Sequence, residues 1–197
     1  FVSLLKRADM TRYELFLRET RTYEIIEDVK NFRSEIGVLF LNSYNRDVLT
    51  KMFDDNRLTY TSLFKARPHI FVSKSNPLAK HEVVSLEDLE DFPYLSYDQG
   101  IHNSFYYSEE ILSQIPHKKS IVVSDRATLF NLLIGLDGYT IATGILNSNL
   151  NGDNIVSIPL DIDDEIDIVY LKHEKATLSK MGEKFLDNLV KEVTFDN

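Results

Sequence analysis

The chain has 197 residues, of which 43% are hydrophobic and 27% charged, so it is long enough for one ordinary domain or for two small lobes with a buried core. The formal net charge of -9 argues against nucleic-acid binding by this segment alone, because phosphate binding requires clustered Lys and Arg. The sequence has no Cys, which excludes a disulfide framework, a thiolate nucleophile and a Cys-ligated metal site.

Two further absences bear on where the chain works. No apolar run approaches the length of a membrane-spanning helix, and no signal peptide is visible at Phe1. The lack of Cys suits a reducing cytoplasm, so we expect a cytoplasmic protein that makes no membrane contact. The chain starts without Met and inside an amphipathic segment, which leads us to expect a fragment of a longer protein.

The first part of the chain alternates between helical and extended patterns. Helical spacing of apolar residues predicts helices over 1–8 and 22–32. Apolar runs predict strands over 13–17, 36–41 and 63–72. Thr22 is the expected cap of the second helix, and the continuous run at 36–41 is typical of a parallel strand covered on both faces. Pro77 lacks an N–H and favours extended geometry at Asn76, which predicts that a strand ends there.

The same alternation continues to the end of the chain. Helices are predicted over 105–114, 127–136 and 178–193. Strands are predicted over 94–97, 119–123, 139–142, 155–158 and 165–171, with a turn-rich stretch at 147–154. Ser85 followed by Asp88 predicts a capping box on one short helical turn. Helices and strands in this order predict an α/β fold with mostly parallel sheets.

The segment that begins at His69 carries a family resemblance. It reads H-I-F-V-S-K-S-N-P-L-A-K, followed by S-L-E-D-L and F-P-Y-L. This order resembles the effector-binding domain of LysR-type transcriptional regulators, in which a strand crosses between two lobes before a His-Pro-Leu-Ala turn and a short L-x-D-L helix. Asn76 stands where His is usual in that turn.

The resemblance extends over nearly the whole chain. The helix pattern that opens at Thr22 and the strand that follows Glu35 are similar to the family's, although Glu35 replaces the usual Asp. The segment from Ser124 to Gly144 is similar to the family's next helix and strand. Gly138 keeps the expected glycine there, whereas Thr143-Gly144 replaces the usual Leu-Pro.

The resemblance implies an α/β fold of two Rossmann-like lobes joined by two crossing strands, of the type II periplasmic-binding-protein kind. Lobe I is expected to hold residues 1–69 and 165–197, and lobe II residues 70–164, with the crossings near 69–73 and 164–168. A small-molecule effector between the lobes, and no catalysis, is also implied. So are a homodimer, a tetramer in the full-length form, and DNA binding through a winged helix-turn-helix domain that is absent from this chain.

The candidate ligand-binding residues follow strands or open helices. Ligands of open α/β sheets bind beyond the carboxyl ends of the strands, where helix N-termini offer free N–H groups. The residues at such places are Thr20, Arg21, Thr22, Asn42, Gln99, Gly100 and Ser124. Thr22 and Ser124 have a plainer interpretation as helix caps, Arg21 as a surface charge, and Gln99-Gly100 as a turn. Hydroxyls, amides and one cation together predict a small anionic or zwitterionic metabolite.

No residue pattern indicates catalysis or a metal site. The five His show no pairing at helical spacing, the acidic run at 161–165 lacks the spacing of a calcium loop, and no nucleophile motif or glycine-rich phosphate loop occurs. We therefore expect no catalytic residue, no metal ligand and no cofactor. The alternative to a regulator domain is an extracytoplasmic solute-binding protein of similar fold, and an enzyme on the same scaffold ranks below it.

The predicted helix at 127–136 has more apolar residues than one buried face needs: Leu129, Phe130, Leu132, Leu133 and Ile134. Members of the resembled family pair side by side and antiparallel. We therefore expect this helix to contact the partner's first helix and its strand at 13–17. Burial of the helix inside its own lobe is the plainer alternative.

Overall fold

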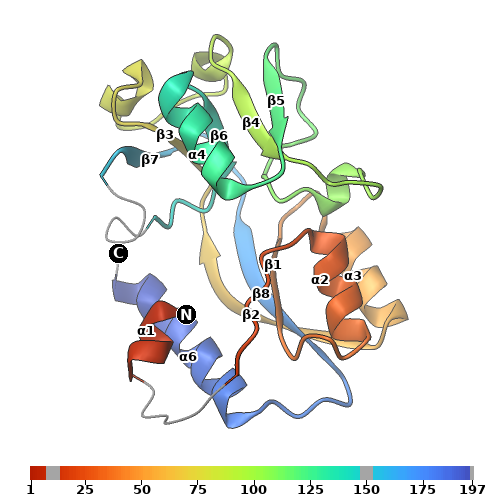
Figure 1. Cartoon of the computed structure of the whole chain (residues 1–197). Helices are drawn as coiled ribbons and strands as arrows, with labels where there is room; N and C mark the ends of the chain where they lie inside the picture. Colours follow the sequence, from red (N-terminus) through yellow and green to blue (C-terminus); the bar gives the residue numbers. More distant parts are fainter. Residues whose placement is uncertain (8–13, 147–152, 196–197) are drawn as a thin grey trace.

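The computed structural model describes residues 1–7, 14–146 and 153–195, and its strands form two separate sheets (Figure 1). In the first sheet, β8 (Ile166–His173) lies between β1 (Gly37–Leu41) and β2 (Leu58–Ala66). The second sheet has the order β5-β4-β6-β3-β7 and consists of β3 (His69–Ser73), β4 (Tyr94–Tyr97), β5 (Ser120–Val123), β6 (Tyr139–Ala142) and β7 (Ile155–Pro159). Each sheet is the centre of one lobe, so the predicted two-lobed α/β architecture is confirmed.

The prediction of mostly parallel sheets is wrong. β8 is antiparallel to both β1 and β2, because the chain enters the first sheet from the second lobe and runs back along its neighbours. In the second sheet, β4 is parallel to β5 and β6, whereas β3 is antiparallel to β6 and β7. β1 is an edge strand antiparallel to β8, and not the parallel strand that was expected; its residues alternate between buried and half-buried.

Two segments of the chain pass between the lobes, and Figure 1 shows β2 and β8 running side by side toward them. Arg67 and Pro68 separate β2 from β3, where one strand over 63–72 was predicted. Pro68 has no N–H to give to a ladder, which explains the break. The chain returns through residues 161–165 into β8.

The helices of the first lobe lie on the two sides of its sheet (Figure 1). α2 (Thr22–Lys30) and α3 (Arg46–Asp55) cover one side, where Ile26 and Phe53 pack with Val169 in one buried cluster. α1 (Val2–Arg7) and α6 (Lys180–Phe195) lie on the other side, and the rings of Phe1 and Phe185 meet edge to face at 6.1 Å. Helix α3 was not predicted. No helix in the described parts of the chain is long and apolar enough to cross a membrane.

In the second lobe, α4 (Arg126–Gly135) packs Leu129 and Leu133 against Leu95 of the sheet. Three short 3-10 helices complete the lobe: η1 (Pro77–Lys80), η2 (Glu87–Leu89) and η3 (Phe105–Tyr107). The predicted capping box is confirmed, since the Ser85 N–H and hydroxyl donate to Asp88 Oδ2 at 2.9 and 2.8 Å.

Three local predictions are corrected by the structure. Residues 14–17 form no strand; Phe16 and Leu17 are 83% and 65% exposed, and the segment has no ladder to join. The helix expected over 105–114 shrinks to η3, because the backbone becomes extended at Ser108, with φ of -59° and ψ of 141°. Beyond that point the Glu110 side chain accepts the Tyr97 N–H at 2.7 Å. Thr22 is the first helical residue and not the cap, a position held by Arg21 without a side-chain bond. Of the turn-rich stretch predicted at 147–154, residues 147–152 lie outside the described residues.

Candidate functional site

Arg21, at the N-terminus of α2, reaches from the first lobe to the second. Its Nε donates to the backbone carbonyl of Asp98 at 2.8 Å, and its Nη2 donates to Asp98 Oδ2 at 2.8 Å. Two donors on one edge of the guanidinium therefore bind two oxygens of one residue, which is the geometry that favours Arg over Lys. The residues concerned are 77 positions apart in the chain.

Gly100 completes the loop around this guanidinium. Its N–H donates to Asp98 Oδ1 at 3.0 Å, and its φ of +61° lies in the left-handed region that favours glycine. A Cβ at this position would lie 2.8 Å from Arg21 Nη1. A side chain at position 100 would therefore both strain the loop and displace Arg21.

A second ion pair joins the two lobes nearby, and here the cation belongs to the second lobe and the carboxylate to the first. Arg126, the first residue of α4, donates from Nε to Glu19 Oε1 at 2.8 Å and also binds it through Nη2. Glu19 and Arg21 are two residues apart in the first lobe, and each pairs with a charge of the second. This arrangement fixes the relative position of the lobes at the start of α2.

Aromatic rings extend the contact between the lobes. The Tyr23 and His102 rings stack with centroids 3.4 Å apart, and those of Tyr44 and Tyr106 stack at 4.8 Å. The Tyr107 hydroxyl donates to Met52 Sδ at 3.7 Å. Each pair joins a first-lobe residue to the loop that follows β4, so this loop closes over the first lobe.

Carboxylates outnumber cations around Arg21. Glu24 Oε1 lies 3.6 Å from Arg21 Nη1. The pKa of Glu109 is raised to about 7, mainly by burial and also by the Glu19 and Glu24 charges, against a hydrogen bond from Gln99 and the charge of Arg21, which lower it. Glu24 Oε2 and Gln99 Oε1 are buried without a hydrogen-bond partner among the described residues. An incoming cationic group would therefore find acceptors here.

The structure brings only some of the predicted site residues together. Arg21, Gln99 and Gly100 lie at the lobe contact, whereas Thr22 is buried at the start of α2 and Thr20 lines a separate cavity of the first lobe. No group of three or more potential metal ligands occurs among the residues with described positions.

Asn42 and Ser124 are engaged differently. Asn42 Oδ1 accepts the Asn45 N–H at 3.0 Å, and its Nδ2 donates to Asp164 Oδ2 at 3.2 Å, so the side chain shapes the turn after β1. Ser124 is exposed, and Asp125 caps α4 by accepting the Thr128 N–H at 2.9 Å.

Sequence reasoning placed Glu19 and Asp98 in candidate segments at strand ends without choosing them as ligand-binding residues, and it did not identify Arg126. The available signal was local: Glu19 and Arg21 place opposite charges two residues apart before a predicted helix. Their partners lie 107 and 77 residues along the chain, and no pattern in one sequence pairs residues at such separations.

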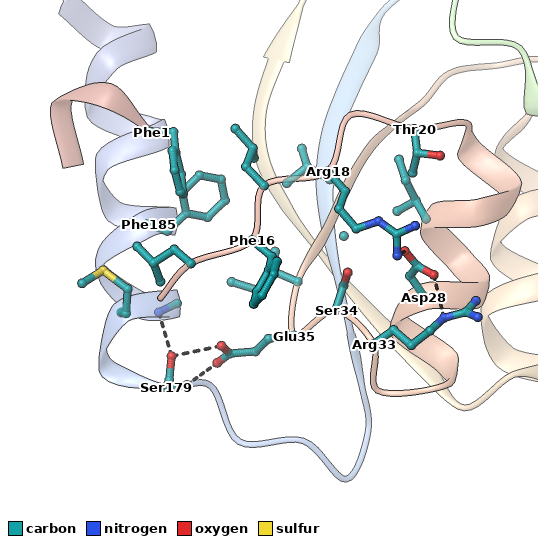
Figure 2. Close-up of a pocket in the computed structure, with 18 of the residues that line it drawn as sticks. Phe1, Phe16, Arg18, Thr20, Asp28, Arg33, Ser34, Glu35, Ser179 and Phe185 are labelled. Carbon is teal, nitrogen blue, oxygen red and sulfur yellow. Dashed lines mark hydrogen bonds and ion pairs between the residues drawn. The ribbon is translucent and has the colours of Figure 1, made fainter. Parts of the chain in front are cut away.

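A cavity of about 400 Å³ lies within the first lobe, between β1, the extended segment 14–20 and the α1–α6 pair (Figure 2). Figure 2 shows Arg18 and Arg33 on either side of Asp28, which is buried; Arg33 Nε lies 2.8 Å from Asp28 Oδ1. At the other end, the Ser179 hydroxyl donates to Glu35 Oε2 at 3.0 Å. The wall between these polar ends is mostly apolar.

A second cavity, of about 390 Å³, lies beneath β4 in the second lobe. Its lining includes five serines, namely Ser96, Ser104, Ser108, Ser113 and Ser120. Tyr94 stacks on His117 at its base, with ring centroids 3.7 Å apart, and burial lowers the pKa of His117. The Tyr94 hydroxyl is buried without a partner among the described residues.

Two α/β lobes joined by two crossings, with charged and aromatic side chains meeting between them, define a two-lobed domain of the type II periplasmic-binding-protein kind. The sequence matches the LysR substrate binding domain over residues 7–194, and the chain belongs to that family. The domains of this family are the regulatory parts of transcriptional regulators and are not enzymes.

Solved structures agree with this assignment at the level of the fold. The C-terminal domain of a probable LysR regulator from Rhodococcus sp. RHA1 is 15% identical, with a TM-score of 0.64 over 96% of this chain and 90% of that one. The BenM effector binding domain with its effector benzoate is 18% identical, with a TM-score of 0.59 over 91% and 78% of the two chains. The QuiR effector binding domain in complex with shikimate is 18% identical, with a TM-score of 0.58 over 87% and 78%.

HinK, a LysR family transcriptional regulator from Pseudomonas aeruginosa, is 15% identical to this chain, with a TM-score of 0.60. The match covers 89% of this chain but only 59% of the length of HinK. Among curated proteins, no sequence is significantly similar to it.

Proposed function

We propose that this chain is the effector-sensing and dimerisation domain of a bacterial LysR-type regulator, and that it binds a small anionic or zwitterionic metabolite between its lobes. The observation that carries the proposal is the meeting of Arg21 with the Asp98–Gly100 loop, at the N-terminus of one helix and the carboxyl end of a strand. Two relatives of the same fold are described with benzoate and with shikimate, both small carboxylates.

Thr22 is the proposed hydroxyl contact at the start of α2, and Thr22→Ala tests it. Losing one hydrogen bond to a charged ligand group should cost about 1.5–3 kcal/mol, which is roughly a tenfold to hundredfold loss of affinity. Calorimetry against a panel of anionic, zwitterionic and neutral apolar metabolites measures the effect. Thr22→Ser keeps the hydroxyl and is the matched control. Binding of neutral apolar compounds alone, with Thr22→Ala unaltered, contradicts the assignment.

For the dimer, we propose that α4 contacts the partner's α1 and its segment 14–17. The outward face of α4 carries Ile134, which is 44% exposed, and the proposed partner surface carries Phe16 and Leu17. Ile134→Asp should yield monomers in sedimentation without loss of helix content, because a charge would be buried unpaired in the interface. Val83→Asp, at an exposed apolar residue of another surface, is the control. A parent chain that is already monomeric at high concentration refutes this interface.

The remaining parts of the proposal concern the whole protein. Lobe I would comprise residues 1–69 and 165–197, and lobe II residues 70–164. The effector would bias the arrangement of the lobes and subunits, and through it that of winged helix-turn-helix domains on DNA, in a cytoplasmic regulator that assembles as a tetramer. Electrophoretic mobility shifts of the full-length regulator, measured with and without effector, would test this coupling.

A further inference from the structure

We propose that the Asp98 side chain occupies the binding position of a ligand carboxylate, and that a carboxylate-bearing ligand displaces it from Arg21 and Gly100. This position, between Arg21 Nη2 and the Gly100 N–H, is called the seat below. This inference rests on the proposed function, since it names the group of the effector that binds and the contact that it replaces. Asp98 is then a specificity-determining residue that competes with the ligand from within the chain.

The geometry of the Asp98 carboxylate supports this seat. One oxygen, Oδ2, accepts from Arg21 Nη2 of the first lobe at 2.8 Å, and the other, Oδ1, accepts from the Gly100 N–H of the second lobe at 3.0 Å. A single carboxylate thus bridges donors that belong to different lobes. A ligand carboxylate in the same place would satisfy the same two donors and would join the lobes in the same way.

The pair is exposed enough to exchange. The Arg21 and Asp98 side chains are 38% and 50% exposed, and ion pairs at such positions are weak because water solvates both partners. A ligand that makes further contacts can therefore displace Asp98. Gly100 leaves room for this exchange, since any side chain there would fill the space beside Arg21 Nη1.

The lobes have further contacts that do not depend on Asp98. The stacked rings of Tyr23 and His102, with centroids 3.4 Å apart, and those of Tyr44 and Tyr106 join the lobes without Asp98, so the lobes stay in contact while the carboxylate is exchanged. The surplus of carboxylates near Arg21, including Glu24 and Glu109, disfavours a ligand with negative charge alone. The seat therefore suits the carboxylate of a zwitterion better than that of a dianion.

Replacing Asp98 by alanine and titrating with acetate tests the seat directly. The two reporters are the NMR signals of Arg21 Nε–H and of the Gly100 amide, one from each lobe. In Asp98→Ala, both should shift with one common Kd for acetate, at least about tenfold lower than in the parent, because the tethered competitor is gone. Acetamide, which has the same shape without the charge, should shift neither signal.

Two further variants make the result decisive. Asp98→Asn fills the seat with a neutral group of the same size that pairs less strongly with Arg21, so acetate should bind it more tightly than the parent and less tightly than Asp98→Ala. Asp98→Ala combined with Arg21→Ala should lose the acetate response of Gly100. The proposal is overturned if Asp98→Ala shows no acetate binding, or if the double variant binds acetate equally well. The metabolite panel tests the proposed function separately: a seat that binds acetate while no metabolite binds the parent leaves this inference standing and removes the proposed effector role.

Discussion

Replacing Asn76 by alanine should destabilise the second lobe, because this one side chain holds two loops together. Asn76 is 1% exposed; its Oδ1 accepts the Leu78 N–H at 2.9 Å, and its Nδ2 donates to the Asp137 carbonyl at 2.7 Å. The Leu78 N–H is buried and finds no water after the substitution, whereas Asp137 is exposed and its carbonyl is rehydrated. Together with the loss of the cap of η1, the cost should be about 2–4 kcal/mol.

Urea unfolding followed by circular dichroism measures this loss of stability. Asn31→Ala is the matched control, because the Asn31 amide donates to the Glu27 carbonyl at 2.7 Å on the exposed end of α2. That substitution should cost about 0.5 kcal/mol, since both groups regain water. If Asn76→Ala costs no more than Asn31→Ala, then the Asn76 hydrogen bonds do not stabilise the lobe and the reasoning is refuted.

Two further predictions concern buried polar groups of the second lobe. Tyr94→Phe removes a buried hydroxyl that has no partner among the described residues, so it should raise stability in thermal unfolding by about 1 kcal/mol; Tyr139→Phe, which loses a 2.9 Å bond to His117, should lower it. Burial raises the pKa of Glu110 from 4.5 to about 7. Between these two pH values the folded state therefore binds more protons than the unfolded state, and the free energy of unfolding falls as the pH rises from about 4.5 to 7. Glu110→Gln should therefore match the parent at pH 5 and exceed it at pH 8 by about 2–3 kcal/mol in urea unfolding, and an equal difference at both pH values would contradict this.

Local chemistry in the sequence predicted several elements of the fold well. The Ser85–Asp88 capping box depends on residues three apart, and the turn at Asn76-Pro77 depends on neighbours, so both are readable from a short window. The type of each sheet depends instead on the direction in which a strand enters it from the other lobe, which is β8 in the first sheet and β3 in the second. That direction is a property of the whole chain path, which is why parallel strands were wrongly expected.

Helix α3 was missed although its signal was present. Val48, Leu49, Met52 and Phe53 have helical spacing, and Leu49 and Phe53 are fully buried. The opposite error occurred at 105–114, where the backbone becomes extended at Ser108 and the Glu110 side chain accepts the Tyr97 N–H of β4. In the candidate site, Arg21 could be chosen from sequence because a strand–helix junction favours ligands, but its partner Asp98 depends on the contact between lobes.

Strand β8 is central in the first sheet, yet it is synthesised after every other described strand. β1 and β2 each pair with β8 and are not neighbours in the sheet, so both lack their common partner until residues 166–173 have left the ribosome. All strands of the second sheet have emerged by then. We therefore expect the second lobe to fold first during translation, while the nascent first lobe exposes unpaired strand edges that a chaperone must shield. Protease protection of ribosome-stalled chains, ended before and after β8, would reveal this order.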